Sequence, residues 1–510
     1  MDFSQIELIY SAEGNANLVV ALPQLKKVLR LPKADIISSS NSKSSKCNTT
    51  TTTTRSSDNS KCDGHHQSEK HQLKHTATTT SNANNNPNGV VTTPDMDQTL
   101  GRMGGGCSNV DVSTDAIVEN AEDDDDDDAV NPEELVAFVS VMAVFIGKEY
   151  VNIPEIVNIT SEADRRRIND FCRPFRPAHR LDKEFCGQFG LLLPDATLLP
   201  ETLLVPGLQH QLTPGDTFAV DIKPKQGWML QDIDVEVKVI YDDGNCGHAA
   251  AAAAVGLSRT SFLNPFNLKA STRCRYCTMQ FSKLRTRKIS RLSAYCPIDM
   301  FSGKPKAMRK SLNALLECPQ NNLRIFRNGH LIYGDQVGSI TLEELKENFF
   351  NGDLTTFQDL IINCLLKNYS DNPTGTGVLE RILNIQLLAK EYITQSCSNN
   401  TSPTNPSKRK TFKWLEKFLE RKSVNCIDDL TPLEKYLIAA TFLDCSIIVA
   451  FKEIHQSNSI QISSHPNVIC LNGKLYLTKV SVLDMDPKPD NHFDKFVKNT
   501  NRAYELADCI

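Results

Sequence analysis

The sequence predicts an α+β fold with a small N-terminal lobe and a larger C-terminal lobe. Three short apolar segments, typical of β-strands, open the chain, and a single apolar helix follows them after a long polar insert. The rest of the chain alternates apolar helices with further strand-like segments. A length of 510 residues suffices for two or three ordinary domains. We place the N-terminal lobe at residues 1–200 and the C-terminal lobe at 201–510.

Composition restricts the class of protein. The net charge is -5 and the hydrophobic fraction 40%, and no run reaches the roughly 18 apolar residues that a membrane-spanning helix needs. The N-terminus lacks the basic start and the cleavage site of a signal peptide. We therefore read the 16 cysteines as reduced thiols in the cytosol or nucleus, with those in apolar runs (Cys364, Cys445, Cys470) acting as small hydrophobes.

The first strands are expected at residues 7–10, 18–22 and 27–31, and a polar insert follows at 38–128. The insert is rich in Ser, Thr, Asn, Gly and His, so it cannot bury enough apolar surface to offset the entropy of ordering. We predict that it is disordered. Its closing run of aspartates, Asp123 to Asp128, is read as a solvated acidic segment rather than a metal site.

Ordered structure is expected to resume at Asn131. This residue is a suitable N-cap, Pro132 suits the first helical position, and the two glutamates that follow favour the first turn of a helix that runs to about Ile146. Two further polar inserts are predicted at 244–254, which contains an alanine run, and at 395–410.

The segment Asp221-Ile222-Lys223-Pro224-Lys225 ends an apolar strand with two lysines. Residues two apart on a strand point the same way, so Lys223 and Lys225 can face one spot, and Pro224 marks where the strand leaves the sheet. Two aligned ammonium groups at a sheet edge suit a polyanion, although lysine is mostly a solvated surface residue.

A basic tract covers residues 273–327 and contains only two acids, Asp299 and Glu317. In an acidic chain this asymmetry indicates a polyanionic partner, either nucleic acid or a dense phosphate ester. The tract lacks the interleaved aromatics of single-strand binders and any zinc-finger or RNP signature, which argues against nucleic acid. Its cations are Arg273, Arg275, Lys283, Arg285, Arg287, Lys288, Arg291, Lys304, Lys306, Arg309, Lys310, Arg324 and Arg327.

Two turns carry residues suited to phosphate. Gly14-Asn15-Ala16-Asn17 lies between two strands and can bring backbone N–H groups to an anion, as the hairpin loop of protein kinases does; an ordinary turn has the same composition. Asn321 and Arg324 lie between a helix (307–316) and a strand-like segment, where an amide and a guanidinium suit phosphate or metal contacts and a plain turn would also use the asparagines.

Cys274, Cys277 and Cys296 supply three potential metal ligands. A structural zinc site needs a fourth ligand, for which Cys246 and His248 are the candidates at an unusual spacing. Buried thiols without a metal are the alternative.

Two aspartates are expected to meet at one end of a β-hairpin. Asp444 precedes a strand at 445–453, and Asp484 follows another at 475–483. If the strands pair as an antiparallel hairpin, the start of one lies beside the end of the other. The two carboxylates would then suit a general base and a metal ligand for phosphoryl transfer, with Lys488 nearby; two carboxylates that cap strands in solvent are the alternative.

These motifs, taken in order, resemble those of the inositol-pentakisphosphate 2-kinases. The resemblance spans most of the chain outside the inserts, and one departure from the family is Asp221, where a glutamate is usual. The matching segments are 13–19, 176–180, 221–225, 319–324, 444–447 and 483–489.

The resemblance implies a bilobal fold similar to that of protein kinases, and transfer of the ATP γ-phosphate to the 2-hydroxyl of inositol 1,3,4,5,6-pentakisphosphate, giving the hexakisphosphate. Asp444 would be the catalytic base, and Mg²⁺ would be held by Asp484, with Asn322 and Asp486 as further candidates. ATP would contact Gly14, Asn15, Ala16, Asn17, Arg30, Asp195, Asp221 and Arg324. The substrate would contact Arg180, Lys223, Lys225, Lys283, Asn321 and Lys488.

Two other functions are compatible with the motifs: a catalytically inactive protein that binds inositol polyphosphates, and an RNA-binding protein that uses the basic tract. The retention of Asp444, Asp484 and Asn321 favours the kinase. We expect a monomer in the cytoplasm and nucleus, with no membrane association.

We expect deletion of residues 38–128 to leave activity intact, because a disordered loop that joins ordered ends is replaceable. The measurement is the turnover of the deleted protein beside that of the full chain. Failure of the deleted protein to fold would contradict the prediction of disorder.

Overall fold

The computed structural model describes residues 3–14, 16–35, 130–203, 215–229, 273–335, 338–371, 375–398, 411–421, 427–454 and 465–507. It is an α+β structure, as predicted, and it contains two antiparallel sheets. The inserts at 38–128 and 244–254 lie outside the described residues, as do Asn15, Cys246 and His248. The insert predicted at 395–410 begins later than expected, because a helix continues to Ser398.

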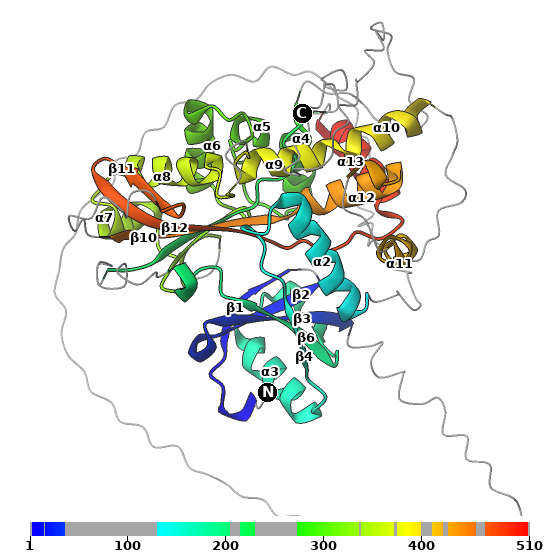
Figure 1. Ribbon diagram of the computed structural model, residues 1–510, viewed down its shortest axis with the longest axis horizontal. Coiled ribbons are helices and arrows are strands. Elements are labelled where there is room, and N and C mark those ends of the chain that lie inside the picture. Colours follow the sequence, from blue (N-terminus) through cyan, green and yellow to red (C-terminus); the bar gives the residue numbers. More distant parts are fainter. Residues whose placement is uncertain are drawn as a thin grey trace, which may run out of the picture. The chain divides into compact units, whose positions relative to one another are not determined.

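The first sheet has six strands in the order β1-β2-β3-β6-β4, with β5 paired to β3 (Figure 1). Its apolar side chains, among them Leu18, Leu29 and Leu31, form a core with residues of α3 (Glu162–Cys172). The strands are β1 (Ile9–Glu13), β2 (Asn17–Leu22), β3 (Lys27–Asp35), β4 (Glu155–Asn158), β5 (Lys183–Phe185) and β6 (Phe189–Pro194).

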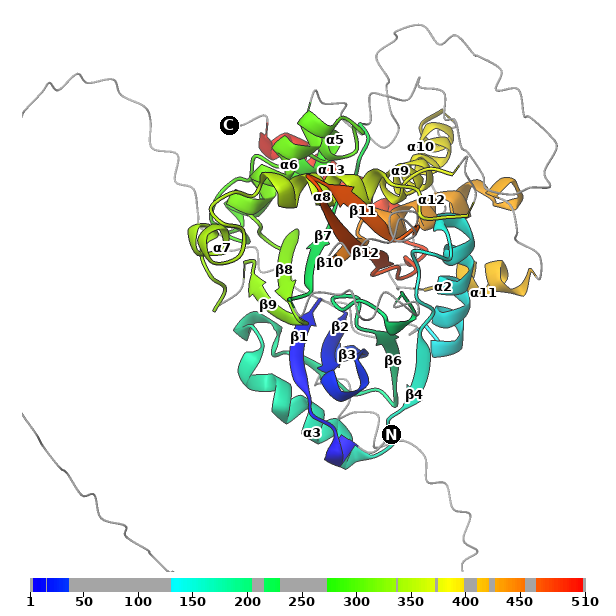
Figure 2. The same cartoon turned by 60° about the vertical axis from the view of Figure 1, so that its left-hand side comes forward.

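The second sheet also has six strands, in the order β11-β12-β10-β7-β8-β9, and helices cover its face opposite to the first sheet (Figures 1 and 2). The strands are β7 (Phe218–Ile222), β8 (Leu323–Arg327), β9 (His330–Tyr333), β10 (Ser446–Ile454), β11 (Val468–Leu471) and β12 (Lys474–Leu483). The helices of this part of the chain are α4 (Arg275–Arg285), α5 (Pro297–Met300), α6 (Pro305–Glu317), α7 (Leu342–Phe349), α8 (Thr355–Leu366), α9 (Val378–Leu387), α10 (Ala389–Ser398), α11 (Lys413–Glu420), α12 (Pro432–Phe442) and α13 (His492–Ala507).

The two faces of β7 differ in what they bury. Val220 and Ile222 join the large core beneath the helices, whereas Ala219 packs on the other face with Ile448 and Ala450 of β10. Side chains alternate along a strand, so Asp221 projects on the same face as Ala219, away from the helical core. The charged residues at the end of β7 therefore lie on the side of the sheet that faces the first sheet.

Helix α2 (Pro132–Ile146) begins with the predicted cap. The Asn131 side chain accepts a hydrogen bond from Glu133 N (3.0 Å), and Glu134 reaches back to the backbone of Asn131, which completes a capping box. The buried face of the helix, including Phe138 and Met142, belongs to the core of the second sheet. The helix precedes β4 of the first sheet, so it links the two parts.

None of the described helices combines the length and apolar character needed to cross a membrane. The cysteines among the described residues are free thiols. Cys364 and Cys445 are buried as expected. Cys470 is exposed, contrary to expectation, because it lies on β11, the edge strand of the second sheet.

Replacing Asn131 with Ala should lower the free energy of unfolding by about 1 kcal/mol, because the first turn of α2 loses its capping acceptor. Chemical denaturation of the two proteins measures this difference. Asn131→Asp serves as the control, since it keeps an acceptor at the same place. An equal loss of stability in Asn131→Asp would contradict the role of the cap.

Candidate active site

Four neighbouring strands of the second sheet bring their ends to one edge. In the antiparallel register Ile222 of β7 is opposite Leu323 of β8 and Ile447 of β10, and Ser446 of β10 is opposite Leu483 of β12. The segments that leave or enter the sheet at these points carry the motifs at 221–225, 319–324, 444–447 and 483–489. Motifs separated by more than two hundred residues are therefore neighbours.

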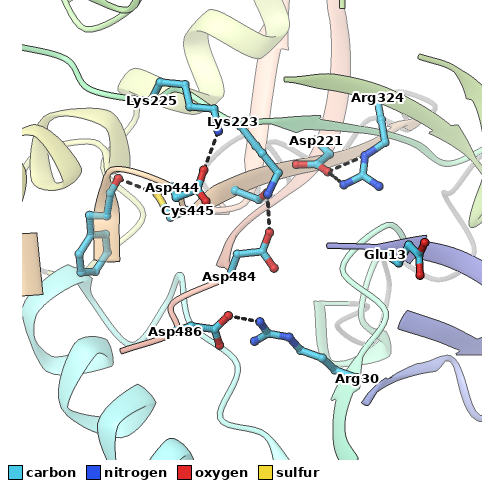
Figure 3. A network of polar contacts seen from close by, with 12 residues as sticks. Glu13, Arg30, Asp221, Lys223, Lys225, Arg324, Asp444, Cys445, Asp484 and Asp486 are labelled. Carbon is cyan, nitrogen blue, oxygen red and sulfur yellow. Dashed lines mark hydrogen bonds and ion pairs between the residues drawn. The ribbon is translucent and has the colours of Figure 1, made fainter. Parts of the chain in front are cut away.

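Each of two aspartates at this edge is paired with a lysine from the end of β7 (Figure 3). Lys223 Nζ lies 2.7 Å from Asp484 Oδ2, and Lys225 Nζ lies 2.6 Å from Asp444 Oδ1. Ser446 Oγ also donates to Asp484 Oδ2, at 3.2 Å. The predicted antiparallel pairing of the strand after Asp444 with the strand before Asp484 is confirmed, and each of the two aspartates binds one of the two predicted lysines.

The lysines keep both carboxyl groups ionised. Burial opposes ionisation of Asp484, but Lys223 and Arg30 more than compensate and hold its pKa well below the ordinary value. At Asp444 desolvation is likewise outweighed by Lys225 and Lys223, so its pKa is also lowered. The Asp444 side chain remains 61% exposed, which leaves it accessible to solvent.

Two arginines form further pairs beside these lysines. Arg324 donates from Nε (3.1 Å) and Nη2 (2.7 Å) to one oxygen of Asp221, whose other oxygen is buried with no hydrogen-bond partner among the described residues. Arg30, on β3 of the first sheet, pairs with Asp486 (Figure 3). The pair of Arg30 and Asp486 thus joins the two sheets across the cleft.

A cavity lies next to this pair. Its lining includes Arg30, Val139 of α2, Leu191 and Leu193 of β6, and Asp484 and Met485 after β12. Apolar side chains from both sheets and from α2 therefore surround one side of the charged cluster. Asp195 is not part of this lining: its Oδ1 accepts from the backbone (2.9 Å) and the hydroxyl (2.6 Å) of Thr197 within its own turn.

The turn between β1 and β2 is closed by its own backbone. Gly14 N donates to Asn17 O at 2.9 Å, so this amide is already engaged, and a side chain built at Gly14 would meet no atom within 4 Å. The turn is tied to Arg180, whose Nη1 donates to the carbonyl of Glu13. Arg180 therefore binds the residue directly before the glycine turn, although the two were predicted to bind different ligands.

Glu13 anchors this arrangement. Its carboxylate accepts from Arg176 Nε (2.8 Å) and Lys33 Nζ (3.2 Å), and all three side chains are only 1% exposed. Burial lowers the pKa of Lys33, and the carboxylate of Glu13 opposes that effect. A buried charge requires such pairing, so this cluster fixes the turn on η4 (Ala178–Arg180).

The remaining predicted residues differ in their surroundings. Lys283, near the end of α4, has a lowered pKa because of burial and the nearby charge of Lys225, which places it beside the lysine pair. Lys488 is close enough to influence Asp444. Asn321 is exposed in the turn before β8, whereas Asn322 is buried, with Nδ2 on the hydroxyl of Tyr276 (2.9 Å) and Oδ1 without a partner among the described residues.

Several cations of the basic tract at 273–327 are paired with acids. Arg309, Lys310 and Arg327 pair with Asp359, Asp299 and Asp216, respectively. These pairs neutralise part of the excess charge that the sequence indicates.

Two residues near Asp444 were not singled out as site residues. Arg275 is packed on the ring of Phe496 at 4.3 Å and donates to Thr500 Oγ1 at 2.7 Å, and burial lowers its pKa. His492 binds the hydroxyl of Tyr436 at 3.0 Å, and burial lowers its pKa to about 3. The position of Arg275 in the basic tract was a signal for that residue.

The three cysteines predicted as metal ligands are close together. Their sulfur atoms all lie within 4.8 Å of one another, with Cys274 and Cys277 at 3.1 Å and Cys274 and Cys296 at 3.8 Å. Among the described residues no fourth His, Cys, Asp or Glu joins them. The proximity of the three ligands is therefore established, and a complete zinc site is not.

Comparison with known proteins shows to which family the chain belongs. The model of the inositol-pentakisphosphate 2-kinase family matches residues 10–502, and the chain belongs to this family. It is 36% identical over 409 residues to a protein of Drosophila melanogaster named inositol-pentakisphosphate 2-kinase, covering 72% of this chain and 56% of that protein. A protein of the same name from Arabidopsis thaliana is 29% identical over 287 residues (55% of this chain, 63% of that protein), and one from Danio rerio is 24% identical over 433 residues (68% and 77%). The chain thus spans less than two thirds of the length of the first two relatives.

Replacing Lys223 with Met should lower the free energy of unfolding at pH 7 by about 1–2 kcal/mol, because Asp484 loses its partner; the value allows for the 39% exposure of Asp484. The folded-state pKa of Asp484 is depressed, so the pair stabilises the fold above the unfolded-state pKa of about 4, and the contribution fades as the pH falls below it. Denaturation at pH 7 and at pH 3 measures the difference.

Lys474→Met is the matched control, since Lys474 pairs with Glu453 on the surface of the same sheet, where the two side chains are 56% and 42% exposed. An effect of Lys223→Met that is equal at both pH values would contradict the pairing.

Proposed function

We propose that this protein transfers the γ-phosphate of ATP to the 2-hydroxyl of inositol 1,3,4,5,6-pentakisphosphate and produces inositol hexakisphosphate. The observation that carries the proposal is the edge where Asp444 and Asp484 lie with Lys225 and Lys223. Asp444 is the more exposed of the two carboxylates, Asp484 is more enclosed, and each has a lysine beside it. Phosphoryl transfer needs a base, a metal ligand and charge neutralisation, and this edge supplies each of them.

Asp444 would act as the base. Its pKa is lowered, so it is ionised at neutral pH and can accept the proton of the substrate hydroxyl at a carboxylate oxygen. Lys225 binds Oδ1, and Oδ2 has no hydrogen-bond partner among the described residues. Lys225 would therefore orient the base and stabilise negative charge on a phosphate beside it.

Asp484 would hold Mg²⁺. The oxygen-donor set suits this ion: the carboxylate is ionised, its Oδ2 is bound by Lys223 and Ser446, and its Oδ1 accepts no hydrogen bond from a described residue. Asp486 and Asn322 remain further candidates. Bound Mg²⁺ would supply neutralisation of charge on the phosphate groups of ATP.

ATP would bind between the two sheets, in a bilobal arrangement similar to that of protein kinases. The apolar lining of the cavity suits the adenine ring, and Arg30 at its edge suits a phosphate. The glycine turn, with open space at Gly14, would face the phosphates.

The inositol ring would lie beside the lysine pair. A ring with five phosphates needs several cations around a small volume, and Lys223, Lys225, Lys283 and Lys488 influence the same aspartate or one another. A substrate that lacks a phosphate would leave one of these cations unpaired, which gives selectivity. We do not favour the non-catalytic alternatives. A protein that only binds a polyanion does not need Asp444 and Asp484, yet both aspartates are present and each is paired with a lysine.

We further propose that the protein acts as a monomer in the cytoplasm and nucleus. A structural zinc on Cys274, Cys277 and Cys296 would require a fourth ligand from outside the described residues.

The test is a phosphoryl-transfer assay with Mg-ATP and inositol 1,3,4,5,6-pentakisphosphate, with the products separated by phosphate number. We expect the hexakisphosphate, and we expect Asp444→Asn to lower kcat by about 10²–10⁴-fold because the base is lost. Asp371→Asn, at an exposed turn, is the control and should be unchanged. Tight pentakisphosphate binding without any product would contradict the proposal, as would normal turnover in Asp444→Asn.

A further inference from the structure

A glutamine lies fully buried behind the lysine and aspartate pairs. Gln386 belongs to α9 and is 0% exposed. Its neighbours on the buried face of the helix, Leu379, Ile382 and Ile385, are apolar. Removing a carboxamide from water is unfavourable unless its polar atoms find partners. The partners of Gln386 are therefore informative.

Gln386 makes three hydrogen bonds, all to backbone and all at 2.9 Å. Its Nε2 donates to the carbonyl oxygens of Lys225 and Phe442, and its Oε1 accepts from the amide of Gly227. Both donors of the amide group are used. One side chain thus joins two segments of backbone that are far apart in the sequence.

These two segments carry the lysine and the aspartate of one catalytic pair. Lys225 binds Asp444 through Nζ, and Asp444 follows Phe442 by two residues at the end of α12. We propose that Gln386 is a positioning residue for phosphoryl transfer: its carboxamide holds the backbone of Lys225 and the end of α12 together, and so fixes the contact of Lys225 with Asp444. This inference rests on the proposed kinase function.

The backbone of Lys225 needs such support. Its φ is +63°, a left-handed backbone conformation that residues other than glycine rarely adopt. Such a conformation persists only where the surrounding structure enforces it. The Tyr295 hydroxyl binds the preceding carbonyl, that of Pro224, at 2.8 Å, and Gln386 binds the carbonyl of Lys225 and the amide of Gly227. Without Gln386 the carbonyls of Lys225 and Phe442 would lack this shared donor.

Only an amide of this length satisfies the arrangement. Glutamate would place a carboxylate against two carbonyl oxygens, methionine would fill the space without any donor, and asparagine would keep the amide but fall short by one methylene. Gln386→Met therefore removes the hydrogen bonds while it keeps the side-chain volume, and Gln386→Asn keeps an amide while it reduces the volume.

The first experiment compares Gln386→Met with the wild type in the phosphoryl-transfer assay, with both rates normalised to the folded fraction. We expect kcat to fall by about 10- to 100-fold, because the reacting groups are displaced, while the KM for ATP changes little. Gln358→Met is the matched control: Gln358 is a buried glutamine on α8 that donates to Asn313, remote in sequence from the site. It should retain wild-type kcat. If Gln386→Met does not fold, Gln386→Asn replaces it in the same comparison.

The second readout is the pH dependence of kcat/KM, which a purely structural role would leave unmoved. Lys225 helps to keep the pKa of Asp444 low, so a displaced Lys225 should shift the acidic limb to higher pH. In a Lys225→Met background the further change Gln386→Met should produce no additional shift. The other titratable and charged groups around Asp444 are left unsubstituted in every variant: Lys223, Lys283, Lys488, Arg275, Cys445 and His492.

The outcomes separate this inference from the proposed function. An unshifted acidic limb, with kcat per folded molecule unchanged, would overturn the role of Gln386 and leave the kinase function intact. A wild type without turnover would overturn the kinase function. In that case the role of Gln386 is decided by ¹³C NMR titration of the Asp444 carboxyl, whose signal is identified by its absence from the spectrum of Asp444→Asn. An equal pKa of Asp444 in the wild type and in Gln386→Met overturns the role. A higher pKa of Asp444 in Gln386→Met supports it.

Discussion

The site depends on the antiparallel register of β12, β10, β7 and β8 in the second sheet. Neighbouring strands run in opposite directions, so the end of one meets the start of the next at the same edge. This register brings Lys223, Arg324, Asp444 and Asp484 together from distant parts of the chain. A shift of one residue would turn every side chain to the other face, and the apolar pattern of Val220 and Ile222 prevents it.

Charge pairing then sets the chemical state of this edge. Burial alone would favour the neutral forms of the two aspartates. The lysines reverse this effect, so both carboxylates stay ionised, as a base and a metal ligand must be. The same cations suit a polyphosphate. The exposure of Asp444 and the enclosure of the lysine side chains (16–17% exposed) allow a ligand to reach groups that the protein holds in place.

The sequence predicted the elements that periodicity and capping determine: the second and third strands, the capped helix α2, and the antiparallel pairing that brings Asp444 and Asp484 to one edge. The first strand, predicted at 7–10, begins two residues later and runs from Ile9 to Glu13. The sequence also predicted which lysines face this edge, because Lys223 and Lys225 follow a strand directly. It did not predict which charged residues pair with one another across the fold. The pairing of Arg30 with Asp486 joins residues 456 positions apart, and nothing in the local pattern encodes it. Arg275 and His492 were missed for the same reason, since their burial depends on tertiary packing.

Two residues of the site have left-handed backbones, Lys225 (φ +63°) and Asp484 (φ +60°). Such conformations are costly for residues with side chains, so the surrounding structure must enforce them. Both residues directly follow or lie near a strand end, where the ladder of the sheet no longer holds the chain. Contacts from outside the sheet take over: Gln386 and Tyr295 fix the segment of Lys225, and Thr441 of α12 donates to the carbonyl of Asp486 at 3.1 Å. The helices behind the sheet therefore determine the geometry of the site as much as the strands do.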